Sequence, residues 1–343
     1  MKKPSFGLLP LPSLPCFRAA LLLLLSPLVA LANTWEPLPT HGQMHPRHEA
    51  AFIAVGDKIY LLGGRRLQPV DILDPATGAW SQGAPPPVEV HHFQPVVWEN
   101  RIWLVGAMTG GYPHERALDH IPVYDPATDT WSRGPSLPEQ RRRGGAGAVI
   151  REGKLYVVCG IINGHWDGHV AWLDELNLAT GAWRELPDAP RARDHFQAAI
   201  VSDKLYAAGG RRSWAARKET FTHVEPLVDA YHFKTGAWST LPSPAGDLPA
   251  PRAGSMSIAI GRHLIVAGGE SLAQTAAHAE VHVLDTATGT WSAWPAFARG
   301  RHGSGLARLG DRLYIASGSG NRGGAPELDS VEVLDIATLP VGK

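Results

Sequence analysis

The stretch GDKIYLLGG, residues 56–64, decides the fold because it recurs along the whole chain. Each copy begins at a short turn, continues as an apolar segment rich in β-branched and aromatic residues, and ends at two small residues. The other copies are ENRIWLVGA (99–107), EGKLYVVCG (152–160), SDKLYAAGG (202–210), GRHLIVAGG (261–269) and GDRLYIASG (310–318). Internal similarity with a period of about fifty residues is the signature of a repeat architecture.

Each repeat predicts four short strands. In the first repeat, the apolar segment AAFIAV (50–55) is followed by Gly56-Asp57, which favours a tight hairpin turn. The strand KIYLL (58–62) comes next, and after a loop follow VDILD (70–74) and a strand that opens with a tryptophan. The equivalent tryptophans, which we expect to pack between sheets, are Trp80, Trp131, Trp183, Trp238 and Trp291. Because no repeat shows a helical period, we expect six four-stranded sheets.

The sixth repeat runs to VEVLDIATLPVGK (331–343) and has no tryptophan of its own. The segment NTWEPLP (33–39) has the form of a final strand but has no preceding strands of its repeat. We expect Trp35 to lie on the outer strand of the sixth sheet, where it would close the ring and remove an open sheet edge. The predicted fold is therefore an all-β, six-bladed propeller over residues 33–343, closed by the N-terminal strand.

These residues resemble the kelch repeat, in which a double glycine, a tyrosine four positions before the second glycine and a later tryptophan mark each blade. The resemblance covers residues 33–343 and implies a kelch β-propeller, the fold of the central domain of galactose oxidase. In architecture and address the chain is also similar to exported bacterial kelch proteins such as N-acetylneuraminate epimerase. Three departures fall at glycine positions, where Cys159 and Ser317 replace the first glycine and Ala107 replaces the second.

The first 32 residues carry the features of an export signal. The basic residues Lys2, Lys3 and Arg18 precede a short apolar run that ends in the small-residue pattern Ala30-Leu31-Ala32. The run is shorter than the roughly 20 apolar residues that a membrane span needs. We therefore expect a signal peptide over residues 1–32, cleavage before Asn33, and a periplasmic or secreted protein without a membrane span.

Charge and cysteine content exclude some classes of partner and of cross-link. The 32 Lys and Arg residues balance the 32 Asp and Glu residues, which argues against nucleic acid as a partner, because surfaces that bind it are strongly basic. Cys16 lies in the predicted signal peptide, so no internal disulfide is expected in the mature protein. The apolar neighbours Val157 and Val158 favour a core position over a reactive thiol for Cys159.

One rim of the predicted propeller collects the starts of the first strands and the loops after the second strands. The resemblance implies that this rim binds ligands. The first-strand starts are Arg47-His48-Glu49, Val90-His91-His92, Arg143-Gly144-Gly145, Arg193-Asp194-His195, Arg252-Ala253-Gly254 and Arg301-His302-Gly303. Arginine opens five of the six, and two interpretations are open: a repeat feature that binds backbone carbonyls, or a set of ligand contacts.

Glu49, His92 and His195 stand out because glycine occupies the same position in the other three repeats. We expect a ligand-binding role for them, with satisfied structural polar groups as the alternative. The loops after the glycines add the candidates Arg65, Trp166, Arg211, Arg212 and Trp214, the two tryptophans as exposed aromatic platforms. Other loop residues that would face this rim are Arg66, Tyr112, His114, Glu115, Arg116, His165, Asp167, His169, Glu270, Asn321 and Arg322.

Three functions are compatible with this rim. The first is an exported module that binds a polar ligand, a glycan or an acidic sugar, with aromatic faces against the sugar and Arg forks on a carboxylate. The second, implied by the resemblance to N-acetylneuraminate epimerase, is a sugar epimerase or mutarotase with Glu49, His92 and His195 as acid and base. Arg211 or Arg212 would then hold the substrate carboxylate. The third is protein–protein recognition, including a cell-surface partner, and no catalytic residue is assigned.

No cofactor and no metal site are expected. The copper–radical site of galactose oxidase needs a cysteine cross-linked to a tyrosine, a second tyrosine and two histidines. Here Cys159 lies inside a predicted strand, and Tyr112 is the only tyrosine outside the repeat strands. A plain metal site from His92, His195 and His302 stays open as an alternative, but the three residues lie in separate repeats and lack the short ligand spacing typical of such sites.

Overall fold

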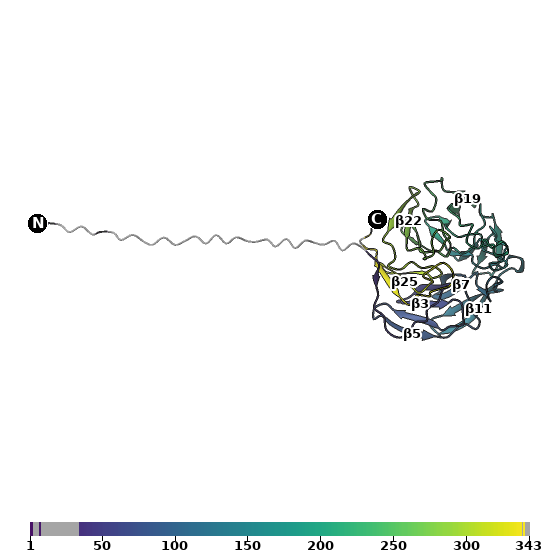
Figure 1. Cartoon of the computed structure of the whole chain (residues 1–343), viewed down its shortest axis with the longest axis horizontal. Helices are drawn as coiled ribbons and strands as arrows, with labels where there is room; N and C mark the ends of the chain where they lie inside the picture. Colours follow the sequence, from purple (N-terminus) through teal and green to yellow (C-terminus); the bar gives the residue numbers. More distant parts are fainter. Residues whose placement is uncertain (3–6, 8–33, 338, 340–343) are drawn as a thin grey trace. The chain divides into compact units, whose positions relative to one another are not determined.

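The computed structural model describes residues 1–2, 7, 34–337 and 339, and residues 34–337 form an almost entirely β structure (Figure 1). Six four-stranded antiparallel sheets follow one another along the chain and form the predicted six-bladed propeller. The predicted signal peptide and its cleavage point fall almost entirely outside the described residues. No helix among the described residues is long and apolar enough to cross a membrane.

We number the blades 1 to 6 in chain order, each with its strands in hydrogen-bonded order. Blade 1 has β2 (Ala50–Val55), β3 (Lys58–Gly63), β4 (Val70–Asp74) and β5 (Ala79–Gly83); blade 2 has β6 (Gln94–Trp98), β7 (Arg101–Val105), β10 (His120–Asp125) and β11 (Thr130–Ser136); blade 3 has β12 (Gly147–Arg151), β13 (Lys154–Val158), β14 (Leu173–Asn177) and β15 (Trp183–Leu186). Blade 4 has β16 (Ala198–Val201), β17 (Lys204–Ala207), β18 (Asp229–His232) and β19 (Ala237–Thr240); blade 5 has β20 (Met256–Ile260), β21 (His263–Ala267), β22 (Val281–Asp285) and β23 (Thr290–Trp294); blade 6 has β24 (Leu306–Leu309), β25 (Arg312–Ala316), β26 (Val331–Asp335) and β1 (Glu36–Pro37).

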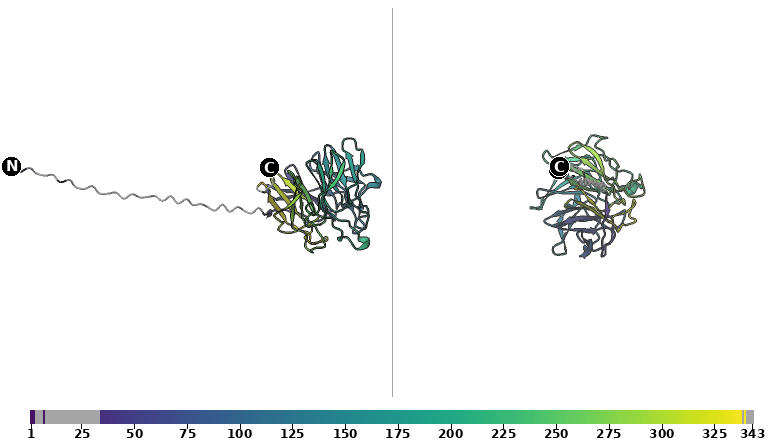
Figure 2. Two further views of the ribbon diagram at one scale, coloured as in Figure 1. Left: turned by 90° about the horizontal axis from the view of Figure 1, so that it is seen from above. Right: turned by 90° about the vertical axis from the view of Figure 1, so that its left-hand side faces the viewer.

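Apolar side chains fill the spaces between neighbouring blades. Six buried clusters are present among the described residues, and each joins residues of two adjacent blades. One of them packs Phe52 and Leu61 of blade 1 against Ala307 and Tyr314 of blade 6. The first and last blades are therefore neighbours, as the purple and yellow strands of Figures 1 and 2 show. Each blade is stabilised from both sides by burial of apolar surface.

The outer strand of blade 6 comes from the early part of the chain. Strand β1 pairs antiparallel with β26, with Glu36 opposite Val333. Trp35 is buried, packs edge-on against Phe297 with ring centroids 4.7 Å apart, and donates its indole N–H to the carbonyl of Pro295 in blade 5 at 2.9 Å. The same contact to the preceding blade is made by Trp131, Trp183, Trp238 and Trp291. Trp35 thus takes the place of the repeat tryptophan in blade 6.

The arginines that open the first strands are part of the scaffold. All five are at most 1% exposed: Arg47, Arg143, Arg193, Arg252 and Arg301. Arg193 is representative, because its guanidinium donates to the carbonyls of Ala207, Gly209 and Leu227 at 3.0–3.2 Å and to the Asp229 carboxylate at 2.6 Å. Of the two open interpretations of this arginine column, the structure supports backbone binding and leaves no surface for ligand contact.

A carboxylate on the third strand accompanies the arginine in four blades. These acids are Asp71, Asp174, Asp229 and Glu332, each paired with the arginine of its own blade. Blade 2 has neither the arginine nor the acid: Val90 stands at the arginine position and Pro122 at the acid position. Blade 5 has His282 in place of the acid, and Arg252 contacts it at 3.1 Å. Four of the five buried arginines therefore have a carboxylate of their own blade as partner, which offsets the desolvation of the guanidinium.

A ring of backbone hydrogen bonds surrounds the centre of the propeller. One residue of each blade takes part, with a left-handed φ between 54° and 65°: Glu49, His92, Gly145, His195, Gly254 and Gly303. The N–H of each of the last five donates to the carbonyl of its counterpart in the preceding blade at 2.7–3.2 Å, and Ala50 N–H closes the circle on Gly303. We call these six residues the central ring. The ring fixes the place from which Glu49, His92 and His195 project.

Candidate functional site

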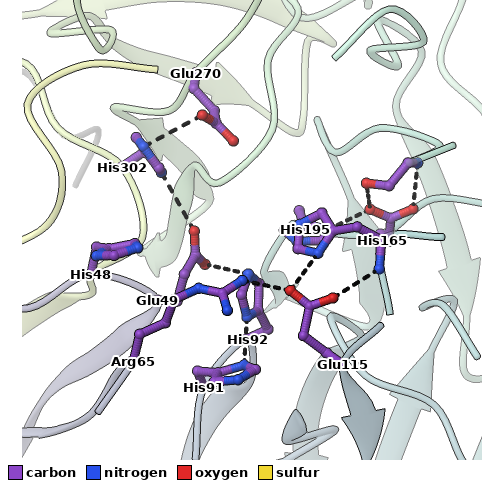
Figure 3. A network of polar contacts seen from close by, with 12 residues as sticks. His48, Glu49, Arg65, His91, His92, Glu115, His165, His195, Glu270 and His302 are labelled. Atoms are coloured by element: carbon purple, nitrogen blue, oxygen red, sulfur yellow. Dashed lines mark hydrogen bonds and ion pairs between the residues drawn. The ribbon is translucent and has the colours of Figure 1, made fainter. Parts of the chain in front are cut away.

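A cavity of about 540 Å³ lies beside the central ring, at the rim where the first strands begin. Its size is in the range of small-molecule binding sites. The charged and imidazole groups in its wall are His48, Glu49, Arg65, His92, His165, Arg211, Glu270 and His302, and Tyr112 and Phe221 add aromatic surface. Figure 3 shows how Glu49, Arg65, His92, His165, Glu270 and His302 converge from different blades. Segments far apart in the sequence therefore build one site.

Three histidines form the most compact group in this site. His92 precedes β6, His165 lies in the loop between β13 and β14, and His195 precedes β16. Their ring centroids are 4.5–5.0 Å apart, and all three side chains are buried. One ligating atom from each lies within 4.8 Å of the others. Burial, together with the neighbouring imidazoles, holds the pKa of His92 well below its usual range and lowers that of His165 to about 4.

Two carboxylates orient this group. Glu115 directly precedes the short strand β9 (Arg116–Ala117), which pairs with β8 (Met108–Thr109). Its carboxylate accepts a hydrogen bond from His165 Nδ1 at 2.9 Å and one from Arg65 at 2.6 Å. Burial opposes its ionisation, but His165 and Arg65 outweigh burial and hold the pKa of Glu115 far below the ordinary value. Asp194 accepts a hydrogen bond from His195 Nδ1. Burial is outweighed there by His195 and Arg211, and the pKa of Asp194 falls to about 2.

The opposite wall of the cavity holds a second set of contacts between carboxylates and imidazoles. Glu49 Oε2 lies 3.5 Å from His92 Nε2, and Glu49 Oε1 lies 3.7 Å from His302 Nδ1 (Figure 3). His302 Nε2 lies 3.4 Å from Glu270, which is also paired with Arg211. Burial opposes ionisation of both acids, but the nearby basic side chains outweigh it, so the pKa of Glu49 is lowered and that of Glu270 falls to about 2.

Backbone strain marks the three central-ring residues that carry side chains. Glu49, His92 and His195 have φ of 54–56°, a region in which residues other than glycine are uncommon. Glycine meets the same backbone requirement in the other three blades without strain. In these three blades the ring therefore carries a side chain at the cost of a strained backbone.

The charges around the cavity do not balance. Glu49 and Glu270 line the cavity, and Glu115 and Asp194 lie behind it as partners of His165 and His195. With each imidazole counted as neutral, these four carboxylates meet two guanidiniums, those of Arg65 and Arg211. Both guanidiniums are already paired, Arg65 with Glu115 and Arg211 with Glu270. The site is accordingly suited to neutral or cationic ligands and poorly suited to anions.

The structure places only some of the predicted site residues in the cavity. Glu49, His92, Arg65 and Arg211 line it, and His195 reaches a smaller hollow of about 40 Å³ inside the central ring. His195 is buried rather than exposed at the rim. The other three predicted residues lie elsewhere: Arg212 is exposed, Trp214 stacks on Arg217 and His169, and Trp166 is 39% exposed and packs against His114.

Four residues of the site are not marked by the sequence. It places Glu115, His165 and Glu270 among the rim residues without distinguishing them, and it does not reveal Asp194 as the partner of His195. The sequence places each of them only within a loop or strand start, since loops of different length have no common register. His165, and not His302, lies with His92 and His195 in the compact group of histidines.

Comparison with known proteins supports this assignment of the fold. Residues 26–210 and 176–340 match the family described as the KLHDC2/KLHL20/DRC7 Kelch-repeats domain. The chain belongs to the kelch-repeat family. A solved structure, described as the structure of YjhT, superposes with a TM-score of 0.68 over 85% of this kelch chain and 95% of its own, at 16% identity. At that identity, the likeness concerns the fold alone.

Two curated relatives show the same kelch pattern. The Kelch-like protein terF of Aspergillus terreus is 31% identical over 309 residues, which is 84% of this chain and 65% of terF. The Acyl-CoA-binding domain-containing protein 4 of Arabidopsis thaliana is 28% identical over 77% of this chain and 41% of its own length. This kelch chain therefore spans between two fifths and two thirds of these relatives, which carry additional sequence.

Proposed function

We propose that this kelch propeller binds a small, neutral, polar molecule, such as a sugar, in its central cavity. The observation that carries the proposal is the enclosed set of hydrogen-bonding groups around Glu49, which lies between His92 and His302. Tyr112 and Phe221 offer apolar faces to the same ligand. An acidic sugar, expected from the sequence, is disfavoured because Arg65 and Arg211 are already paired and the cavity has an excess of negative charge.

The same groups are suited to proton transfer on the bound ligand. Glu49 can accept a proton, and the imidazole of His302, whose Nδ1 lies 3.7 Å from Glu49 Oε1, can take it on or return it. Opening and reclosing a sugar hemiacetal requires such a pair of groups on one ligand. Epimerase or mutarotase activity on a neutral sugar is thus the reaction class that we propose, with Glu49 as the residue nearest the chemistry.

A binding screen tests the proposal. Neutral and acidic sugars would be titrated into the purified protein by calorimetry and thermal shift, with Glu49→Gln as the test variant and Arg212→Gln as the matched control on the exposed rim. We expect a neutral sugar to bind, Glu49→Gln to weaken it by tenfold or more, about 1.4 kcal/mol, and Arg212→Gln to leave it unchanged. Tighter binding of acidic sugars, or full binding by Glu49→Gln, would contradict the proposal.

Export is part of the same proposal. The apolar run and the Ala30-Leu31-Ala32 pattern support secretion to the periplasm or the medium, where free sugars are available. Mass spectrometry of protein expressed in a bacterial host should find a mature chain that begins near Asn33. An intact apolar run in the fractionated protein would contradict export by this signal.

Protein recognition is a second candidate, favoured by apolar side chains at the rim. The loops between second and third strands expose Leu67, Tyr112, Ile162, Trp166 and Leu272, which are 38–58% exposed. Exposed apolar groups that gather on one face are typical of a docking surface. Substitution of Leu67 and Leu272 by serine would weaken a protein partner at this rim but not a sugar in the cavity, which separates the two candidates.

A further inference from the structure

The protonation pattern of the three buried histidines can be read from their hydrogen-bond partners. Arg211 Nη2 lies 3.3 Å from His165 Nε2. A guanidinium only donates, so His165 Nε2 carries a lone pair and its Nδ1–H donates to Glu115. The Asp194 carboxylate only accepts, so His195 carries its proton on Nδ1 as well.

His92 follows the same pattern through a relay. The carbonyl of Gly110 accepts a hydrogen bond from His91 Nε2 at 3.0 Å, so the neutral His91 ring presents a lone pair at Nδ1. That atom lies 2.7 Å from His92 Nδ1, which is therefore the donor. All three rings of the group thus carry their protons on Nδ1 and have unprotonated Nε2 atoms, and one ligating atom of each ring lies within 4.8 Å of the others.

Two of these lone pairs have no suitable partner in the part of the chain that the structure describes. His195 Nε2 has no hydrogen-bond partner, although the side chain is only 1% exposed. His92 Nε2 faces Glu49 Oε2 at 3.5 Å, a contact between two acceptors. A buried polar atom without a partner destabilises the protein, and a cation between the acceptors would reverse that effect.

From this geometry we infer that His92, His165 and His195 form a binding site for a divalent transition metal of the zinc type. Three imidazoles with one position open toward the cavity are a typical donor set for catalytic zinc. Hydrogen bonds from Nδ1 to Glu115 and Asp194 are the carboxylate–histidine contacts that orient metal ligands. The excess of two negative charges around the cavity matches the charge of such an ion.

Binding would move the three rings and break one contact. The ligating atoms lie within 4.8 Å of one another, so the rings would draw together slightly around the ion. Arg211 would give up its contact with His165 Nε2 and keep its pairing with Glu270. Glu49, beside His92, would be adjacent to the open position of the metal. This inference goes beyond the proposed function, since a metal can bind in the absence of any sugar.

Metal titration of the full protein tests the inference. After treatment with a chelator, zinc chloride would be titrated by calorimetry, and cobalt chloride would report the ligand geometry by its visible absorption. We expect one ion per chain, loss of binding in His165→Gln and in His195→Gln, and an affinity about 10- to 100-fold lower in Asp194→Asn. His48→Gln, which alters a cavity histidine that is paired with Glu327, is the matched control and should bind normally.

Circular dichroism and melting without metal would establish that each variant is folded. If His165→Gln does not fold, His195→Gln and Asp194→Asn still test the site. The inference is overturned if the wild-type protein binds no zinc or cobalt stoichiometrically, or if folded His165→Gln and His195→Gln bind as the wild type does. Equal loss in His48→Gln would overturn the assignment to these three ligands. None of these readouts depends on a sugar.

Discussion

At the scale of single residues, the buried arginines are the most exacting feature of the fold. Arg301 donates to the carbonyls of Ser317 and Ser330 and pairs with Glu332, entirely out of contact with water. Replacing it with methionine would leave a buried carboxylate without its cation. We predict that Arg301→Met lowers the free energy of unfolding by about 3–5 kcal/mol, measured by urea denaturation.

The control for this prediction is Arg212→Met, on the exposed rim. A surface substitution of this kind should change the free energy of unfolding by less than about 0.5 kcal/mol. Equal effects of the two substitutions would show that the buried ion pair contributes nothing specific to stability.

A second residue-scale prediction concerns strain in the central ring. Glu49 holds a left-handed φ of 55°, which costs a residue other than glycine roughly 1–2 kcal/mol. Glu49→Gly would remove both this strain and a carboxylate that is only 12% exposed. We predict that Glu49→Gly is at least as stable as the wild type in chemical denaturation while losing sugar binding. A marked loss of stability would instead assign Glu49 a structural role.

The sequence alone located these ring positions because they belong to the repeat. Comparison of six aligned strand starts separates Glu49, His92 and His195 from the glycines of the other blades. It could not show that His195 is buried or that Asp194 binds it, because side-chain partners depend on how neighbouring blades meet. Glu115 and His165 were beyond such reasoning, since their loops have no counterpart of equal length in the other blades.

At the scale of elements, strand β22 departs from the pattern of its counterparts. It presents His282 to Arg252, where four other blades present a carboxylate to the equivalent arginine. We predict that His282→Asp raises the free energy of unfolding by about 1 kcal/mol at pH 7, because it supplies a charge-assisted hydrogen bond to a buried guanidinium. His282→Asn, which adds no charge, is the control.

This substitution also has a predictable dependence on pH. Burial, together with Arg252, lowers the pKa of His282 to about 4 in the folded protein. The unfolded chain therefore takes up a proton at His282 near pH 6.5, whereas the folded protein takes it up only near pH 4. The contribution of neutral His282 to wild-type stability is full above pH 6.5 and falls as the pH drops toward 4. The advantage of His282→Asp should widen over that interval, and a constant difference would contradict the assignment.

Strand β1 gives a further prediction at this scale. Removal of residues 33–40 would take away Trp35 and leave β26 as an unpaired edge. We expect a loss of more than about 3 kcal/mol in the free energy of unfolding, comparable to or larger than that of Trp35→Ala. An unchanged melting temperature of the truncated protein would show that blade 6 does not need this strand.

The strands themselves were readable from the sequence, whereas the small hairpin of β8 and β9 was not. Repeated alternation, turn residues and tryptophans predict the four strands of each blade. Among the described residues, a two-stranded pairing forms in this loop of blade 2, which has two adjacent glycines at 110 and 111, whereas the corresponding loops of blades 3, 4 and 6 form single bridges. It nevertheless positions Glu115, which shows that the non-repeated elements carry much of the site.

At the scale of the whole molecule, the apolar cores tie the blades into one unit. Each core belongs to two blades, so unfolding of one blade would expose two cores at once. We predict a single cooperative transition, with tryptophan fluorescence and far-ultraviolet circular dichroism giving coincident curves in urea. Separate transitions from the two signals would show that groups of blades unfold independently.

The six residues of the central ring share one backbone conformation but contact different neighbours, and this makes the ring a suitable target for directed evolution. A Cβ added at Gly145 would meet no atom closer than 3.4 Å, and its nearest neighbours are the backbone nitrogen and imidazole of His195. Asparagine tolerates a left-handed φ better than most residues, so Gly145→Asn would introduce a new amide beside the histidines without rebuilding the blade. A library at this one codon could therefore alter the chemistry of the site while the propeller around it stays the same.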